Sequence, residues 1–274
     1  MTHRCHPRCR YVGFVVAVLW GTAPHGGRYW HSVSWPWRLG VTPGPPTCDV
    51  PHGSADPVGV AWLTWWVSER SSWAERVRIG YDAASCAYRA EDAAVELYES
   101  WIDQLRTLLP VRGRVVDLGC GCGVPVARDL TESGHAVVGI DVSEVQIERA
   151  RALIPDALFT RCDLAEVEFE LGQFDAAVML YSIIHLPLEK QETVLRRIAS
   201  WLRPGGVLLM TAGVEAWTGS EDGWLGTNAT MWWSQADAAT YRTWLQLAGF
   251  IIDHEATVPD GSSAHSLFWA HTAA

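Results

Sequence analysis

Positive charge is scarce in this sequence. Its 274 residues include 21 basic side chains against 31 acidic ones, for a net charge of −10, and Lys190 is the only lysine. This balance disfavours a nucleic-acid partner, because the phosphate backbone is itself negative. Long apolar runs are also missing: the run at 12–20 is shorter than the ~20 residues that a membrane-spanning helix needs. We therefore expect neither a nucleic-acid nor a membrane partner.

The cysteines do not form a disulfide framework. There are seven, an odd number; two of them stand in a glycine-rich loop and a third ends a predicted strand. Cys5 and Cys9 lie near His3 and His6, but no second pair of ligands follows at the spacing of a zinc finger. No acidic cluster suited to a magnesium-dependent reaction is evident either, so we expect no metal.

Two phosphate-binding motifs are absent as well. The dinucleotide fingerprint G-x-G-x-x-G is broken, because Val124 stands where its third glycine belongs, and no Gly-Lys-Ser/Thr completes a P-loop. A Tyr-x-x-x-Lys pair is also lacking. These absences count against a nicotinamide-dependent oxidoreductase, which stays the alternative from another enzyme class.

The sequence does contain a strand, a glycine loop and a helix in direct succession. Residues 114–118 are short, apolar and β-branched, as expected of a strand covered on both faces, and residues 119–123 read Gly-Cys-Gly-Cys-Gly. Glycines let the backbone turn sharply and approach a ligand. The helix that follows offers free N–H groups and the positive end of its dipole. The acid ahead of the loop, Asp117, suits a cationic ligand better than a phosphate.

Acidic residues stand at three successive predicted strand ends. Asp117 precedes the glycine loop, Asp141 ends the strand 136–141, and Asp163 follows the strand 157–162. Open α/β sheets bind ligands at the carboxyl edge of their strands, and an acid there accepts both hydroxyls of a ribose. The three acids therefore predict a ligand site along one edge of a sheet.

Residues 115–123 resemble motif I of the class I S-adenosylmethionine-dependent methyltransferases, and residues 73–272 resemble their small-molecule branch. The resemblance implies an α/β fold: a doubly wound, seven-stranded, mostly parallel sheet (the Rossmann-like methyltransferase fold) with helices on both faces. It also implies an antiparallel last strand, the strand order 3-2-1-4-5-7-6, and S-adenosylmethionine as the cosubstrate. The residues expected to bind it are Tyr81, Asp117, Gly119, Cys120, Gly121, Gly123, Asp141, Val142, Asp163, Leu164 and Leu180.

The residues that face the methyl acceptor are less clearly marked. His185 follows the fourth strand of the predicted sheet, where a histidine takes or relays a proton near neutral pH; the alternative is that it only positions its loop. Residues 214–234 form a long connection with four tryptophans, which either wall an acceptor pocket or pack on the N-terminal lid. The expected acceptor-binding residues are Tyr88, Tyr181, Trp217, Trp224, Trp232 and Trp233.

Residues 1–66 differ from the rest of the chain. They hold five arginines and two acids, with scattered glycine, proline and tryptophan and no persistent periodicity. The run 12–20 resembles a secretory signal, but export would separate an enzyme from a cosubstrate made in the cytosol. We expect a poorly structured extension, or upstream DNA translated from a start placed too early. The methyltransferase domain follows at 67–274, with a lid at 67–110.

These observations predict a cytoplasmic enzyme, a monomer or homodimer. It transfers a methyl group from S-adenosylmethionine to an oxygen or nitrogen of a small-molecule acceptor, with secondary metabolites as candidates. We expect that acceptor to be small, flat and largely apolar. Besides the oxidoreductase, one alternative stays open: a cofactor-binding fold that has lost catalysis and serves as a regulatory partner.

Overall fold

The computed structural model describes residues 18–19, 31–32, 57–91, 96–261 and 263–274. The chain divides into two units: residues 11–63 form one, and residues 1–10 with 64–274 form the other. In the smaller unit, β1 (Val18–Leu19) pairs antiparallel with β2 (His31–Ser32). Helix α1 (Pro57–Tyr88) begins in that unit and continues into the larger one. The domain boundary at 67 therefore falls inside a helix, and it stays a prediction.

The larger unit is built on a seven-stranded sheet with the order β10-β11-β7-β6-β3-β4-β5. Its parallel strands β3 to β7 are Arg114–Leu118, Ala136–Asp141, Leu158–Arg161, Phe174–Met179 and Leu202–Gly213. Strand β11 (Ser263–Thr272) runs antiparallel to both β7 and β10 (Phe250–Asp260). Counted along the chain within this sheet, the order is the predicted 3-2-1-4-5-7-6, so the predicted fold class is confirmed.

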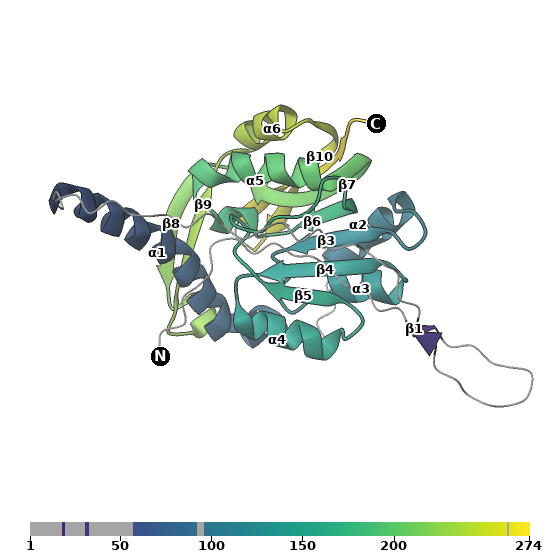
Figure 1. Cartoon of the computed structure of the whole chain (residues 1–274), viewed down its shortest axis with the longest axis horizontal. Helices are drawn as coiled ribbons and strands as arrows, with labels where there is room; N and C mark the ends of the chain where they lie inside the picture. Colours follow the sequence, from purple (N-terminus) through teal and green to yellow (C-terminus); the bar gives the residue numbers. More distant parts are fainter. Residues whose placement is uncertain (1–17, 20–30, 33–56, 92–95, 262) are drawn as a thin grey trace, which may run out of the picture. The chain divides into compact units, whose positions relative to one another are not determined.

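Helices cover both faces of this sheet. Figure 1 shows α3 (Val126–Glu132) and α4 (Glu144–Leu153) on one side, and α5 (Leu188–Trp201) and α6 (Ala238–Leu247) on the other. The connections run outward from the sheet centre in opposite directions, and right-handed crossovers then place their helices on opposite faces. Helix α2 (Glu96–Leu108) packs on α3. Every residue of β6 is buried, which places the core around the central strands.

The connection 214–234 is not an irregular loop. It contains a hairpin of β8 (Trp217–Asp222) and β9 (Thr230–Gln235), with a short 3-10 helix at Trp224–Gly226 between the strands. Strand β8 cannot be recognised from the sequence because of its composition. Trp-Thr-Gly-Ser-Glu-Asp lacks the apolar alternation of a half-buried strand, and five of its six residues are exposed.

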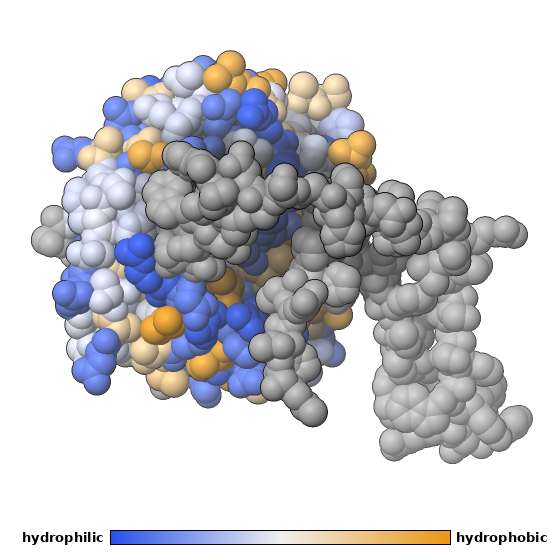
Figure 2. Space-filling model, turned by 60° about the vertical axis from the view of Figure 1, so that its left-hand side comes forward, coloured by the Kyte–Doolittle hydropathy of each residue, from blue (hydrophilic) through white to orange (hydrophobic). Residues whose placement is uncertain are grey.

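The surface of the described residues carries no sign of a membrane span. Among them, no helix is both long and apolar enough to cross a bilayer. On the face that Figure 2 shows, hydrophobic residues lie scattered among hydrophilic ones in the coloured area. Scattered exposure of this kind is normal for a protein surface.

Candidate functional site

The glycine loop after β3 has a backbone that other residues rarely adopt. Gly119 has a φ of +80°, and a Cβ there would lie 2.3 Å from the Cβ of Ser182, so a side chain has no room. Gly121 also has a positive φ, +54°, but a Cβ there would meet nothing closer than 3.8 Å. The first glycine therefore allows close packing, and the second leaves the backbone open to a ligand.

Backbone N–H groups fix the carboxylate of Asp141 at the end of β4. Gly121 donates to its Oδ2 at 2.9 Å and Ser143 donates to its Oδ1 at 2.8 Å. The side chain is buried, and loss of solvent raises its pKa to about 6 in spite of these hydrogen bonds. A carboxylate has about four acceptor positions, so about two remain for ligand hydroxyls.

Asp117 is the second buried carboxylate of the site. It is 4% exposed, and burial, with a smaller contribution from the negative charge of Asp141, raises its pKa to about 7. It lines a cavity of about 40 Å³ beside the glycine loop, together with Arg89 at the end of the lid. An anion and a cation on one small cavity suit the ammonium and carboxylate groups of an amino acid.

A second cavity, of about 60 Å³, continues along the sheet edge and shares Gly119, Gly121 and Leu180 with the first. All the predicted cofactor-binding residues except one line these two cavities; they are Tyr81, Asp117, Gly119, Cys120, Gly121, Asp141, Val142, Asp163, Leu164 and Leu180. Gly123 is the exception, since a Cβ there would lie 2.5 Å from Cδ1 of Ile154. It lets the loop pack on α4, and the structure does not bring it to the ligand cavities.

A wide cleft adjoins these cavities. Its volume is about 1120 Å³. Residues of the lid, of the loop that follows β6, of the hairpin and of the β10–β11 turn line it. Four residues line both the cleft and the 60 Å³ cavity: Tyr81, Tyr88, Tyr181 and His185. A ligand in the narrow cavity and a second ligand in the cleft would therefore meet at these four side chains.

His185 stands at this junction with a single tautomer. Its Nδ1 lies 2.8 Å from the carbonyl oxygen of Trp232, which only accepts, so Nδ1 carries the proton. Its Nε2 therefore accepts from the hydroxyl of Tyr81 at 2.9 Å. Burial lowers the pKa of His185 to about 4, so the ring is neutral at physiological pH. Burial also raises the pKa of Tyr81 well above 10, so that hydroxyl keeps its proton.

The hairpin turns its neighbouring tryptophans in opposite directions. Successive residues of a strand point to opposite faces: Trp233 lines the cleft, whereas the ring of Trp232 lies 6.3 Å from that of Trp73 in α1. Of the predicted acceptor residues, the structure thus brings Tyr88, Tyr181, Trp217, Trp224 and Trp233 to the cleft. Trp232 instead packs against the lid and contributes only its carbonyl group to the site. The segment therefore lines the cleft with three of its tryptophans and packs on the lid with the fourth.

Tyr181 has an unusual backbone. Its φ is +56°, a left-handed conformation that is uncommon for a bulky residue, and its N–H donates to Oγ1 of Thr211 at 2.7 Å. In this conformation its ring lies 4.8 Å from that of His265, nearly perpendicular to it, and 6.1 Å from that of Tyr98. Tyr181 therefore lies between the lid side and the β11 side of the cleft.

Sequence reasoning missed six charged or titratable residues of the cleft: Arg89, Tyr98, Glu215, Glu221, Asp260 and His265. His265 opens β11, where it pairs with Gly213 at the end of β7. Because β11 is antiparallel, its first residues lie at the edge where the parallel strands end. The predicted antiparallel last strand was therefore the available signal. It implies that the β10–β11 turn lies at the ligand edge of the sheet.

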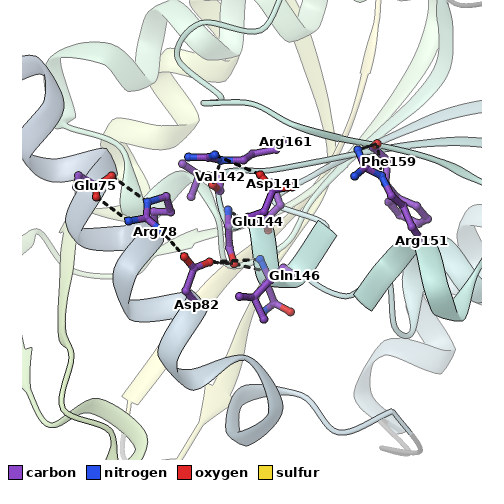
Figure 3. Close-up of polar contacts among 12 residues, drawn as sticks. Glu75, Arg78, Asp82, Asp141, Val142, Glu144, Gln146, Arg151, Phe159 and Arg161 are labelled. Atoms are coloured by element: carbon purple, nitrogen blue, oxygen red, sulfur yellow. Dashed lines mark hydrogen bonds and ion pairs between the residues drawn. The ribbon is translucent and has the colours of Figure 1, made fainter. Parts of the chain in front are cut away.

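Polar contacts join the lid to the helix after Asp141. Asp82 lies between Arg78 on its own helix and the start of α4 (Figure 3), where its Oδ1 accepts from Oγ of Ser143 at 2.6 Å. Arg149 of α4 donates to the carbonyl oxygens of Ser85 and Arg89, both at 2.9 Å. Since α1 also lines the 60 Å³ cavity, these contacts hold one wall of that cavity in place.

The sheet order, the glycine loop and the three strand-end acids define an α/β protein of the class I methyltransferase type. Residues 115–206 match the family described as methyltransferase domain. The solved structure of magnesium protoporphyrin IX methyltransferase (ChlM) from Synechocystis PCC 6803, with bound SAH, has the same fold. Its TM-score is 0.58 at 19% identity, over 74% of this chain and 100% of that one. Residues 115–206 thus form a methyltransferase domain, and the sheet that contains them has the fold of the class I S-adenosylmethionine-dependent methyltransferases.

Two curated relatives show how varied the similar proteins are. The chain is 36% identical over 147 residues to 27-O-demethylrifamycin SV methyltransferase of Amycolatopsis mediterranei, which covers 50% of this chain and 51% of that protein. It is 35% identical over 116 residues to sterol 24-C-methyltransferase erg6 of Schizosaccharomyces pombe, covering 40% and 29%. The chain spans about half the length of the first curated relatives that it matches.

Proposed function

We propose that this protein transfers the methyl group of S-adenosylmethionine to an oxygen or nitrogen of a small-molecule acceptor bound in the 1120 Å³ cleft. One observation carries the proposal: Tyr81, Tyr88, Tyr181 and His185 line both this cleft and the cavity beside the strand-end acids. Two reactants held there would be aligned at one junction, and alignment of reactants supplies a large part of catalysis.

The residues of the narrow cavities fit S-adenosylmethionine. Asp141 has acceptor positions for ribose hydroxyls, and Asp163 and Leu164 lie farther along the same edge. Asp117 and Arg89 offer opposite charges for the amino-acid end. When bound, the cosubstrate supplies an electrophilic methyl group on a sulfonium, and the buried carboxylates provide the negative charge that suits a cation.

His185 and Tyr81 form the proton-accepting pair of this proposal. The Tyr81 hydroxyl donates to Nε2 of His185, and Nδ1–H is already donated to a carbonyl group. An acceptor that gives its proton to the Tyr81 oxygen lets that hydroxyl pass its own proton to Nε2. With a pKa of about 4, His185 is a weak base, so orientation of the acceptor contributes more than proton affinity.

This neutral pair favours an O–H or N–H nucleophile over a carbon one, because such an acceptor loses a proton as the new bond forms. The cleft also admits a larger acceptor than we predict from the sequence. Its volume exceeds the ~300–1,000 Å³ of typical small-molecule sites. Location in the cytoplasm and a monomeric or homodimeric state stay predictions.

Incubation with methyl-labelled S-adenosylmethionine and a panel of phenols, alcohols and amines tests the function. We expect label in a product for at least one oxygen or nitrogen acceptor, and labelling slower by about 10²–10⁴-fold with the His185→Ala variant. Binding of the cosubstrate without transfer to any member of a broad panel would favour the regulatory alternative. Label found on carbon would contradict the heteroatom assignment.

A further inference from the structure

One face of the β8–β9 hairpin forms a wall of the acceptor cleft. Trp217 pairs with Gln235, and Gly219 pairs with Trp233, so strand alternation brings these four and Glu221 to the same face. All of them except Gly219 line the cleft. The glycine makes room for an indole: a Cβ on Gly219 would lie 2.5 Å from Cζ2 of Trp217.

The aromatic rings of this wall lie close to one another along the cleft. The ring centroids of Trp217 and Trp233 are 6.0 Å apart, and those of Trp224 and Trp233 are 5.9 Å apart at 80°. Tyr81 adds a ring at 5.3 Å from Trp224, again at 80°. Nearly perpendicular indole and phenol faces of this kind bind organic cations through the negative potential of each face.

The charged residues of the cleft are mostly acidic. Glu215, Glu221 and Asp260 line it, and Arg89 is the one lysine or arginine among its described lining residues. The Arg89 guanidinium already stacks over Tyr88 and Tyr98, at 5.6 and 5.1 Å from their ring centroids. By contrast, no described residue forms an ion pair or hydrogen bond with the carboxylates of Glu215 and Glu221. Two carboxylates beside an aromatic wall thus lack a counter-charge from the described residues.

A buried histidine adds an independent sign of a ligand. His265 is 8% exposed and lines the same cleft. Its Nε2 lies 3.2 Å from Oδ2 of Asp260, so Nε2–H donates to that carboxylate and Nδ1 is left as an acceptor. Nδ1 has no hydrogen-bond donor among the described residues. A buried acceptor without a donor is costly, so a donor from the ligand is expected to satisfy it.

We infer that the methyl acceptor carries a protonated amino group, which the indole faces of Trp224 and Trp233 and the carboxylates of Glu215 and Glu221 hold. This inference rests on the proposed function and names the class of acceptor for the same cleft. The nucleophilic oxygen or nitrogen lies elsewhere on that acceptor, toward His185 and Tyr81. A purely apolar acceptor would leave these two exposed carboxylates without a counter-charge.

A pair of probes with the same length and different charge tests this. 4-Phenylbutylamine is protonated at pH 7, whereas 4-phenylbutan-1-ol is neutral, and each is titrated calorimetrically into the full chain. We expect the amine to bind on the order of tenfold more tightly, and the preference to weaken at high salt. The double variant Glu215→Gln/Glu221→Gln should bring the ratio of the two affinities close to one.

The matched control is Asp222→Asn, an acid of the same hairpin that lies on the opposite face and accepts from Oγ1 of Thr230. It should keep the preference for the amine. Equal affinities in the wild type, or a preference that survives the double variant, would overturn the inference.

S-adenosylhomocysteine is titrated in the same samples. If it binds and the amine preference is absent, only the acceptor class is refuted. A chain that prefers the amine and does not bind S-adenosylhomocysteine refutes the proposed function instead.

Discussion

The hydroxyl of Ser143 donates a hydrogen bond of 2.6 Å to Asp82, and this contact ties the lid helix to the start of α4. The backbone N–H of the same serine donates to Asp141, the carboxylate that faces the ligand cavity. The cavity, at about 60 Å³, is much smaller than the ~300 Å³ of the smallest typical ligand sites. We therefore expect α1 to move outward when a cofactor enters, and the contact at Asp82 to hold it closed afterwards.

We therefore expect Asp82→Ala to speed both the association and the dissociation of S-adenosylhomocysteine, dissociation the more. The dissociation constant should rise about fivefold, the value of roughly 1 kcal/mol for one hydrogen bond. Stopped-flow tryptophan fluorescence measures both rates. The control is Glu75→Gln, which removes an exposed partner of Arg78 and should change neither. An unchanged dissociation rate in Asp82→Ala would show that this contact does not hold the lid.

The affinity for S-adenosylmethionine should rise with pH through about 7. The pKa of Asp117 is raised to about 7 by burial, and only its ionised form attracts a cationic ligand. Below pH 7 the affinity should fall by up to about tenfold per pH unit, since one proton must be released on binding. Calorimetry between pH 5.5 and 8.5 checks this. Asp117→Asn should bind weakly with a flatter profile, and a wild-type profile without a pH dependence would contradict the assignment.

The same shift predicts how stability depends on pH. The folded-state pKa of Asp117 lies above its ordinary value of 3.8, so its contribution favours folding at low pH and is lost as the pH rises through about 7. The thermal stabilisation that S-adenosylmethionine provides should therefore grow over this range. Differential scanning fluorimetry with and without the cosubstrate measures it, and a stabilisation that shrinks with rising pH would have the wrong sign.

Removing His185 should slow transfer more than it weakens binding. For His185→Ala we expect single-turnover rates to fall about 10²–10⁴-fold with unchanged cofactor affinity. Tyr81→Phe should cost a similar factor, and the double variant little more, because the two side chains act as one unit. The pKa of about 4 predicts no contribution from His185 to the pH profile between 5.5 and 9. A small loss of rate in His185→Ala would leave this residue with a positioning role, and a wild-type rate would remove it from the mechanism.

Gly119→Ala should abolish cofactor binding and destabilise the fold. Its Cβ would collide with Ser182, in addition to the strain of a positive φ. Gly134→Ala is a matched control, because Gly134 has a φ of +86° and nothing lies within 4 Å of its added Cβ. That variant should bear only the backbone strain and keep its affinity. Equal effects of the two variants on cofactor binding would contradict the packing argument.

The sequence predicts this fold well because its signals are local. Buried β-branched strands that end in Asp117 and Asp141, each followed by a helix, determine the parallel half of the sheet and the ligand edge. The acceptor side is less visible, since Trp232 and Trp233 are told apart only once β9 is known to be a strand. His265 comes to the cleft through the antiparallel pairing of β11 with β7, a contact between residues far apart in the chain. Hydrophobic periodicity carries no information on such pairings.

Calorimetric titration of S-adenosylmethionine into the wild-type chain and Asp141→Ala tests the central claim most directly. Asp141 is buried at the carboxyl end of β4 and presents its remaining acceptor positions to the cavity. We expect clear binding to the wild type and a loss of about 1–3 kcal/mol in Asp141→Ala, because ligand hydroxyls would be left unpaired in a dry site. The control Glu144→Ala, which removes an exposed acid three residues along, should bind normally. No binding to the wild type, or equal affinity in Asp141→Ala, would contradict the account.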